Sequence, residues 1–132
     1  MITREFINPD GAWNPAGRSY SHVVKISQPE SLIFVAGQAA VDENMQLICA
    51  DIEGQTRAVF ENIRRDLEAA GATLADIVDM TVYLIDIEEK WAVRKVREEF
   101  FEDGKYPVSA MIGVAAFAFE GMRIEIDVVA AI

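Results

Sequence analysis

MRIEIDVVAAI, residues 122–132, says more about the fold than any other stretch of this sequence. Apolar side chains at every second position alternate with Arg123, Glu125 and Asp127, a pattern typical of a β-strand with one buried face. Charged side chains in an apolar strand are costly unless they are solvated or paired. Two interpretations follow. Either this face is solvated or salt-bridged, or Glu125 lines a cleft, where it orients a water molecule or transfers a proton.

Other apolar stretches predict the remaining strands of the sheet. The run LIFVA at 32–36 is expected to be buried on both faces, and it lies near enough to the alternating stretch 20–26 to form a hairpin. Strands are expected over residues 2–7, 20–26, 32–36, 77–85, 108–116 and 122–132.

Two stretches have apolar residues at helical spacing. The first covers residues 51–70, with Asp51 as N-cap and Gly71 just past its end. The second covers residues 87–102, and its apolar side is expected to consist of Trp91, Val93, Val96 and Phe100.

The predicted order is β-β-β-α-β-α-β-β in one α+β domain, residues 1–132, with a mixed sheet and both helices on one face. The other face remains apolar, and we expect other subunits to cover it.

The composition argues against several classes of partner. The net charge of −10 disfavours nucleic acid and anionic membranes, because both require clustered Lys and Arg. The sequence contains no apolar run near the ~18 residues of a membrane span and no signal-peptide pattern. Cys49 is the single cysteine, which fits a cytoplasmic location.

Few residues suggest chemistry by type or spacing. No cluster of ligating residues predicts a metal site, and no glycine-rich loop predicts a phosphate-bearing cofactor. His22 stands alone, and a lone histidine on a strand is more often structural than catalytic. Trp13 lies in a loop rich in proline and glycine, where it either packs on the body or a neighbouring subunit, or forms a wall of a ligand site.

Six short motifs occur in order between residues 15 and 131. They are PAG with SYS at 15–21, FVAGQ at 34–38, Gln55 with Asn62 and Gly71, TVYL with Asp86 at 81–86, FF with YP at 100–107, and IEI at 124–126. Each motif is common by itself. Together and in this order they resemble the RidA/YjgF family of small proteins, many of which deaminate reactive enamines and imines.

The resemblance implies a chorismate-mutase-like fold, a homotrimer and small-molecule clefts between neighbouring subunits. It also implies hydrolysis of an imine to ammonia and a carbonyl compound without a cofactor. This reaction requires that the protein orient the substrate carboxylate, supply one water molecule and transfer one proton.

The family's functional positions transfer to this sequence with one departure. The resemblance assigns the water-positioning role to Glu125 and substrate contacts to Tyr20 and Gly37. Ser109, followed by Ala110, stands where deaminating members carry the arginine that clamps the substrate carboxylate, and a hydroxyl cannot replace a bidentate guanidinium.

Arg94 stands on the second predicted helix where deaminating members often carry Asn. Two positions for it remain open: it brings positive charge back to the cleft, or it lies in solvent near Glu98.

The sequence thus supports two functions. One is deamination of a pathway-specific enamine or imine, with an altered pocket formed by Tyr20, Gly37, Arg94, Ser109 and Ala110 around Glu125. The other is a trimer that binds a small molecule without turnover. Ribonuclease activity is disfavoured by the acidic charge and the lack of a histidine pair.

Overall fold

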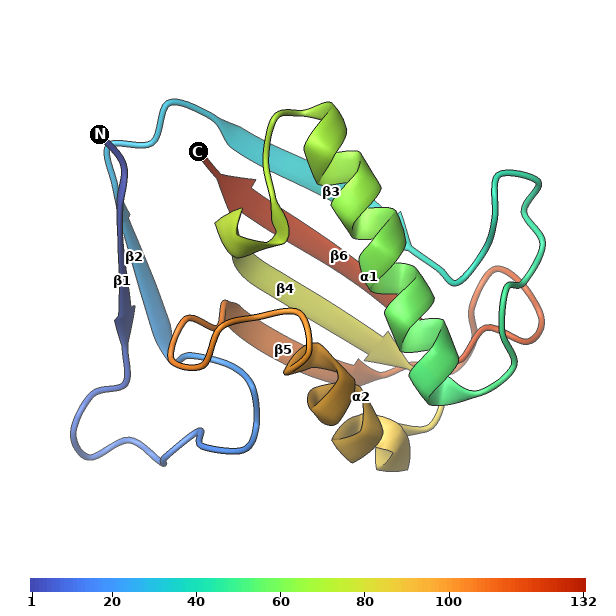
Figure 1. Cartoon of the computed structure of the whole chain (residues 1–132). Coiled ribbons are helices and arrows are strands. Elements are labelled where there is room, and N and C mark those ends of the chain that lie inside the picture. Colours follow the sequence, from blue (N-terminus) through green and yellow to red (C-terminus); the bar gives the residue numbers. More distant parts are fainter.

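The computed structural model describes residues 1–132 and contains two sheets and two helices. Short 3-10 turns, Leu74–Asp76 and Ile87–Glu89, precede β4 and α2. The order of elements confirms the predicted α+β fold (Figure 1). These elements are β1 (Thr3–Ile7), β2 (Val23–Ser27), β3 (Leu32–Gln38), α1 (Ile52–Ala69), β4 (Ile77–Leu84), α2 (Lys90–Arg97), β5 (Val108–Gly113) and β6 (Ile124–Ala131).

The main sheet has four strands in the order β3-β6-β4-β5, in which β4 and β5 are parallel and the other pairs are antiparallel. β1 and β2 form a separate antiparallel ribbon. The predicted hairpin between residues 20–26 and 32–36 is therefore wrong. Gln28, with φ 56°, bends the chain out of β2, and β3 then pairs with β6.

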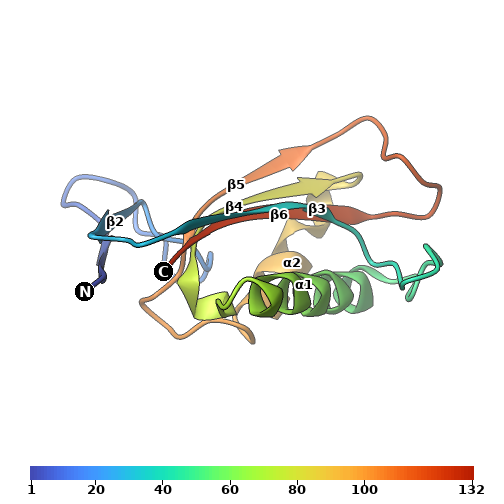
Figure 2. The same ribbon diagram turned by 90° about the horizontal axis from the view of Figure 1, so that it is seen from above.

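Both helices cover the same face of the main sheet, as predicted (Figure 2). Asp51 caps α1 by accepting a hydrogen bond from the Gly54 amide at 2.7 Å, and Gly71 has φ 80° just past its end. The apolar stripe of α1 is buried against the sheet, and each such side chain contributes roughly 1.5–3 kcal/mol. Its buried apolar members are Ile52, Val59, Phe60, Ile63 and Leu67.

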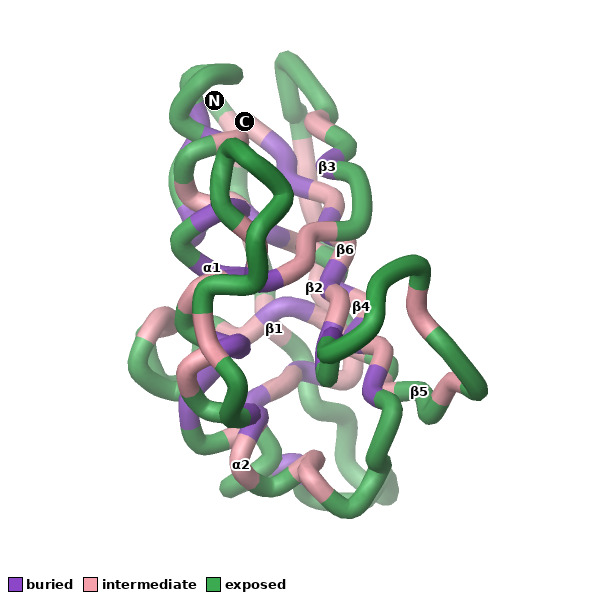
Figure 3. Tube along the Cα trace, turned by 90° about the vertical axis from the view of Figure 1, so that its right-hand side faces the viewer, coloured by how far each residue is buried: buried purple, intermediate pink, exposed green.

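The opposite face of the sheet is uncovered within one chain. The prediction that residues 32–36 are buried on both faces is wrong here, because β3 is an edge strand and no helix covers its outer side. Phe34 is 75% exposed, Leu32 and Ile112 are also exposed, and only Val35 of β3 is buried. In Figure 3 the buried segments follow α1 and the strands behind it, and the connecting loops are exposed.

Several elements are shorter than predicted. α2 ends at Arg97 rather than at 102, although Phe100 still stacks on Phe60 with ring centroids 4.7 Å apart. β2 begins at Val23, so Tyr20 and His22 lie in the preceding loop. The last two strands are also shorter than predicted, because β5 ends at Gly113 and β6 begins at Ile124.

Candidate functional site

Glu125 lies in β6 on the face of the sheet away from the helices. It pairs with Tyr83 of β4, whereas its neighbours Ile124 and Ile126 are fully buried beneath the helices. The side chain is half-buried, and its carboxylate accepts no hydrogen bond from the protein. A carboxylate placed in this way is free to bind a water molecule or to take a proton.

The absence of a side chain at Gly37 leaves room for the Glu125 carboxylate. A Cβ atom added at Gly37 would lie 2.5 Å from Glu125 Oε2 and 2.8 Å from its carboxyl carbon. Any larger residue at this position would push the carboxylate away. The structure therefore brings together Gly37 and Glu125, which we call the glutamate group.

The other charged residues of the alternating stretch 122–132 have partners. Arg123 pairs with Glu89 at 3.0 Å, and the Tyr83 hydroxyl donates to Asp127 at 3.1 Å. That hydrogen bond is the main cause of the raised pKa of Tyr83. The salt-bridged interpretation thus fits Arg123, but it does not fit Glu125.

Ser109 faces the helices and not Glu125. It pairs in register with the buried Met80, and its hydroxyl accepts a hydrogen bond from Arg97 Nη1 at 2.8 Å. Met80 and Tyr83 point to opposite sides of β4, since successive side chains alternate along a strand. Within one chain, Ser109 and Glu125 are therefore on opposite faces of the sheet.

Arg97 organises the helix side of the site. Its side chain is 1% exposed, and it donates to Ser19 Oγ at 2.9 Å, to Ser109 Oγ and to the Arg18 carbonyl at 2.9 Å. Burial lowers its pKa to about 10, which leaves it charged at neutral pH. Ser19 has φ 58°, an uncommon conformation for a residue other than glycine, and the bond from Arg97 helps to hold it.

The sequence analysis missed Arg97, although a signal was present. It falls at helical spacing among Val93, Val96 and Phe100, in the middle of the apolar stripe of the helix. An arginine at a core position of this kind indicates a buried polar network.

Arg94 lies beside Arg97 and packs against an aromatic ring. Its guanidinium carbon is 4.5 Å from the centroid of Trp91, and the guanidinium of Arg18 approaches the same ring to 5.6 Å. Arg94 makes no ion pair with Glu98, and its buried Nε and Nη1 have no hydrogen-bond partner. Burial, followed by the nearby charge of Arg18, lowers the pKa of Arg94. Trp91, expected on the apolar side of the helix, is 52% exposed.

Tyr20 belongs to an aromatic cluster in the loop before β2. Trp13 Nε1 donates to the Tyr20 hydroxyl, and the His22 ring lies edge-on to Trp13 with centroids 4.5 Å apart. Ser21 anchors this loop by donating through its hydroxyl to the Tyr106 carbonyl at 2.6 Å. Trp13 therefore contacts a predicted ligand-binding residue, and His22 supports the loop.

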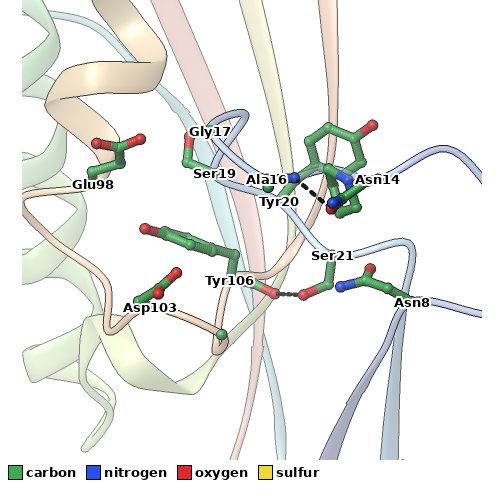
Figure 4. A pocket seen from close by; sticks show the side chains of 12 residues that line it. Asn8, Asn14, Ala16, Gly17, Ser19, Tyr20, Ser21, Glu98, Asp103 and Tyr106 are labelled. Atoms are coloured by element: carbon green, nitrogen blue, oxygen red, sulfur yellow. Dashed lines mark hydrogen bonds between the residues drawn. The ribbon is translucent and has the colours of Figure 1, made fainter.

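A polar hollow of about 500 Å³ lies next to this loop (Figure 4). It shares Ser19 and Tyr20 with the residues described above, and its other wall includes Glu98 and Asp103. No Lys or Arg lines it, so it is poorly suited to an anionic ligand. The positive charge lies instead with Arg18, Arg94 and Arg97, which we call the arginine cluster.

The predicted site residues therefore form two sets within one chain. Arg94 belongs to the arginine cluster on the helix side, and Tyr20 and Ser109 lie near that cluster. Ala110 pairs with Thr81 and shares the open face with Glu125, but it lies on β5, two strands away from β6.

The structure shows two further features that bear on function. No group of three or more His, Cys, Asp or Glu side chains is placed to hold a metal ion. Neither helix has the length and apolarity required to cross a membrane.

Comparison with known proteins places the chain among relatives of the same length. The family model described as Endoribonuclease L-PSP matches residues 12–132. A RutC family protein of Pyrococcus abyssi is 39% identical over 105 residues, which is 79% of this chain and 80% of that protein. A protein of Escherichia coli named "Putative reactive intermediate deaminase TdcF" is 30% identical over 102 residues, covering 76% of this chain and 78% of TdcF.

Solved structures agree with the sequence matches. YyfB of Yersinia pestis, described as a member of the conserved Rid protein family, has a TM-score of 0.90 at 30% identity and covers 98% of both chains. TdcF of Escherichia coli with bound serine has a TM-score of 0.71 at 27% identity, over 89% of this chain and 95% of that one. The fold, the motifs and these matches together show that the chain belongs to the Rid (RidA/YjgF) family.

Proposed function

We propose that this protein hydrolyses a small reactive enamine or imine to a carbonyl compound and ammonia. The observation that carries the proposal is the Glu125 carboxylate, which lies against Gly37 without a hydrogen-bond partner. The family relationship supports the reaction class, since the related TdcF is named as a reactive intermediate deaminase. No cofactor is required for this chemistry.

The proposed mechanism uses Glu125 as a general base and then as a general acid. The carboxylate takes a proton from a bound water while the water oxygen bonds to the carbon of the protonated imine, which gives a carbinolamine. Glu125 then gives this proton to the amine nitrogen. The C–N bond breaks, ammonia leaves, and the carbonyl forms as the hydroxyl proton passes to Glu125 and on to the released ammonia.

We further propose that the complete site forms between two copies of the whole domain, residues 1–132, in a homotrimer. The glutamate group lies on the open face of the sheet, whereas the arginine cluster lies on the helix side beside β5, an edge strand. A neighbouring copy that covers the exposed Leu32, Phe34 and Ile112 would also bring one chain's Glu125 toward another chain's arginine cluster.

The direct test of the reaction class is ammonia release from freshly generated 2-iminobutanoate and 2-aminoacrylate. We expect the protein to accelerate hydrolysis of at least one compound above the buffer rate, in proportion to protein concentration. The absence of acceleration for these and for dicarboxylic enamines, together with measurable metabolite binding, would contradict the enzyme assignment. It would support the second candidate, a binding trimer, which is motivated by Ser109 in place of the family's arginine.

A further inference from the structure

Carboxylate pairing sets the arginine cluster apart from most other arginines of the chain. The chain has 22 acidic residues and a net charge of −10, so carboxylates are abundant. Arg18, Arg94 and Arg97 nevertheless have no carboxylate within ion-pair distance. Four other arginines each have one at 2.7–3.0 Å, namely Arg4, Arg57, Arg64 and Arg123.

Arg97 does not bind the ligand itself, because its side chain is buried and each of its three nitrogens already donates to the protein. Nε, Nη1 and Nη2 donate to Ser19, Ser109 and the Arg18 carbonyl. Arg97 is therefore a positioning residue that holds the loop carrying Arg18 against α2. It also adds a fixed positive charge beneath the surface, which a nearby anion would feel strongly because burial weakens screening.

Arg94 has the opposite arrangement, since its guanidinium donates no hydrogen bond to the protein. Its Nε and Nη1 are buried without a partner, an arrangement that folded proteins rarely retain. Its Nη2 also donates to no protein atom but is not buried in this way, so it is free to donate to an anionic ligand.

Arg18 places a second guanidinium near the same ring. Both guanidinium carbons lie within 5.6 Å of the Trp91 centroid, and the Arg18 side chain is exposed and makes no hydrogen bond to the protein. One carboxylate would offset only one of the three positive charges, whereas two anionic groups on a short ligand would meet both Arg94 and Arg18.

From this arrangement we propose that Arg94 and Arg18, both close to the Trp91 ring, bind a dianion, and that the substrate is a dicarboxylic enamine or imine. The proposal rests on the proposed function for the reaction, but the binding site stands on the arginine cluster alone. The guanidinium that recognises the carboxylate would come from α2 and the loop, and not from β5, where Ser109 stands. The product would be a dicarboxylic oxo acid together with ammonia.

Calorimetric titration of the full-length protein with maleate and crotonate tests this proposal. Both probes are four-carbon unsaturated acids: maleate carries two carboxylates in cis, whereas crotonate carries one carboxylate and a trans methyl group. We expect maleate to bind at least about tenfold more tightly than crotonate. Arg94→Gln and Arg18→Gln should each weaken maleate binding roughly 10–100-fold, the effect of losing one charge-assisted hydrogen-bonded contact.

Arg64→Gln is the matched control, because this half-exposed arginine also lies over an aromatic ring, Phe100, at 5.7 Å but pairs with Glu61. It should leave maleate binding unchanged. Equal binding of maleate and crotonate, or maleate binding that survives Arg94→Gln, would overturn the proposal. Glu125→Gln should retain maleate binding, so loss of turnover with intact binding would bear on the reaction and not on the dianion site.

Discussion

Replacing Glu125 with glutamine is expected to lower kcat for imine hydrolysis by roughly 10²–10⁴-fold, the usual contribution of a general base. Glutamine keeps the shape of the side chain but cannot take a proton from water. The carboxylate accepts no hydrogen bond from the protein, so the change removes no structural contact and thermal stability should stay the same. Ammonia release and thermal unfolding, measured on the same preparation, check both expectations.

Two companion variants sharpen this prediction. Asp127→Asn changes a carboxylate on the same strand and face, one that is held by the Tyr83 hydroxyl, and it should alter kcat by less than about threefold because Asp127 does not carry the proton. Gly37→Ala should lower kcat while the chain still folds, because the added Cβ displaces a flexible side chain and not the backbone. Equal losses of kcat in Glu125→Gln and Asp127→Asn would contradict the assignment of Glu125 as the general base.

Replacing Arg97 with methionine is expected to reduce the free energy of unfolding by roughly 2–3 kcal/mol. The change removes charged hydrogen bonds to Ser19, Ser109 and the Arg18 carbonyl, each worth about 1.5–3 kcal/mol. Relief of the desolvation of a buried guanidinium offsets part of this loss. Ser19 also loses a contact that holds its left-handed backbone, so the loop that carries Tyr20 should loosen.

Denaturant unfolding measures the effect of Arg97→Met, and Arg64→Met serves as the control at a half-exposed position of α1. The control should cost less than about 1 kcal/mol, because its ion pair with Glu61 is partly solvated. An Arg97→Met protein as stable as the natural one would contradict this prediction, because it would show that the desolvation cost of the guanidinium cancels the gain from its hydrogen bonds.

The fold was predictable where local pattern and tertiary burial agree. The alternation around Glu125 has the two-residue period of a strand, and the stripe from Val59 to Leu67 has the 3.6-residue period of a helix. The structure places these stretches in β6 and α1. Strand pairing was harder to predict from the sequence. Residues 20–26 and 32–36 resemble a hairpin, but pairing depends on long-range contacts, and β3 pairs with β6, about a hundred residues further along the chain.

The candidate site was predictable only in part. Glu125 and Gly37 follow from the motifs, and the structure places them in contact. Arg97 was missed because helical periodicity treats position 97 as core, and only the folded chain shows that Ser19 and Ser109 accept its hydrogen bonds. The orientation of Ser109 toward the helices depends on the register of β5 against β4, which no local pattern fixes.

Subunit complementation tests the central claim, a site shared between copies, most directly. Glu125→Gln and Arg94→Gln chains are mixed in equal amounts by joint refolding and assayed well below KM. Random assembly of a cyclic oligomer would give about a quarter of the sites one intact arginine cluster and one intact glutamate from different chains, and hence about a quarter of the natural activity. Activity no higher than the mean of the two separate variants would contradict a shared site.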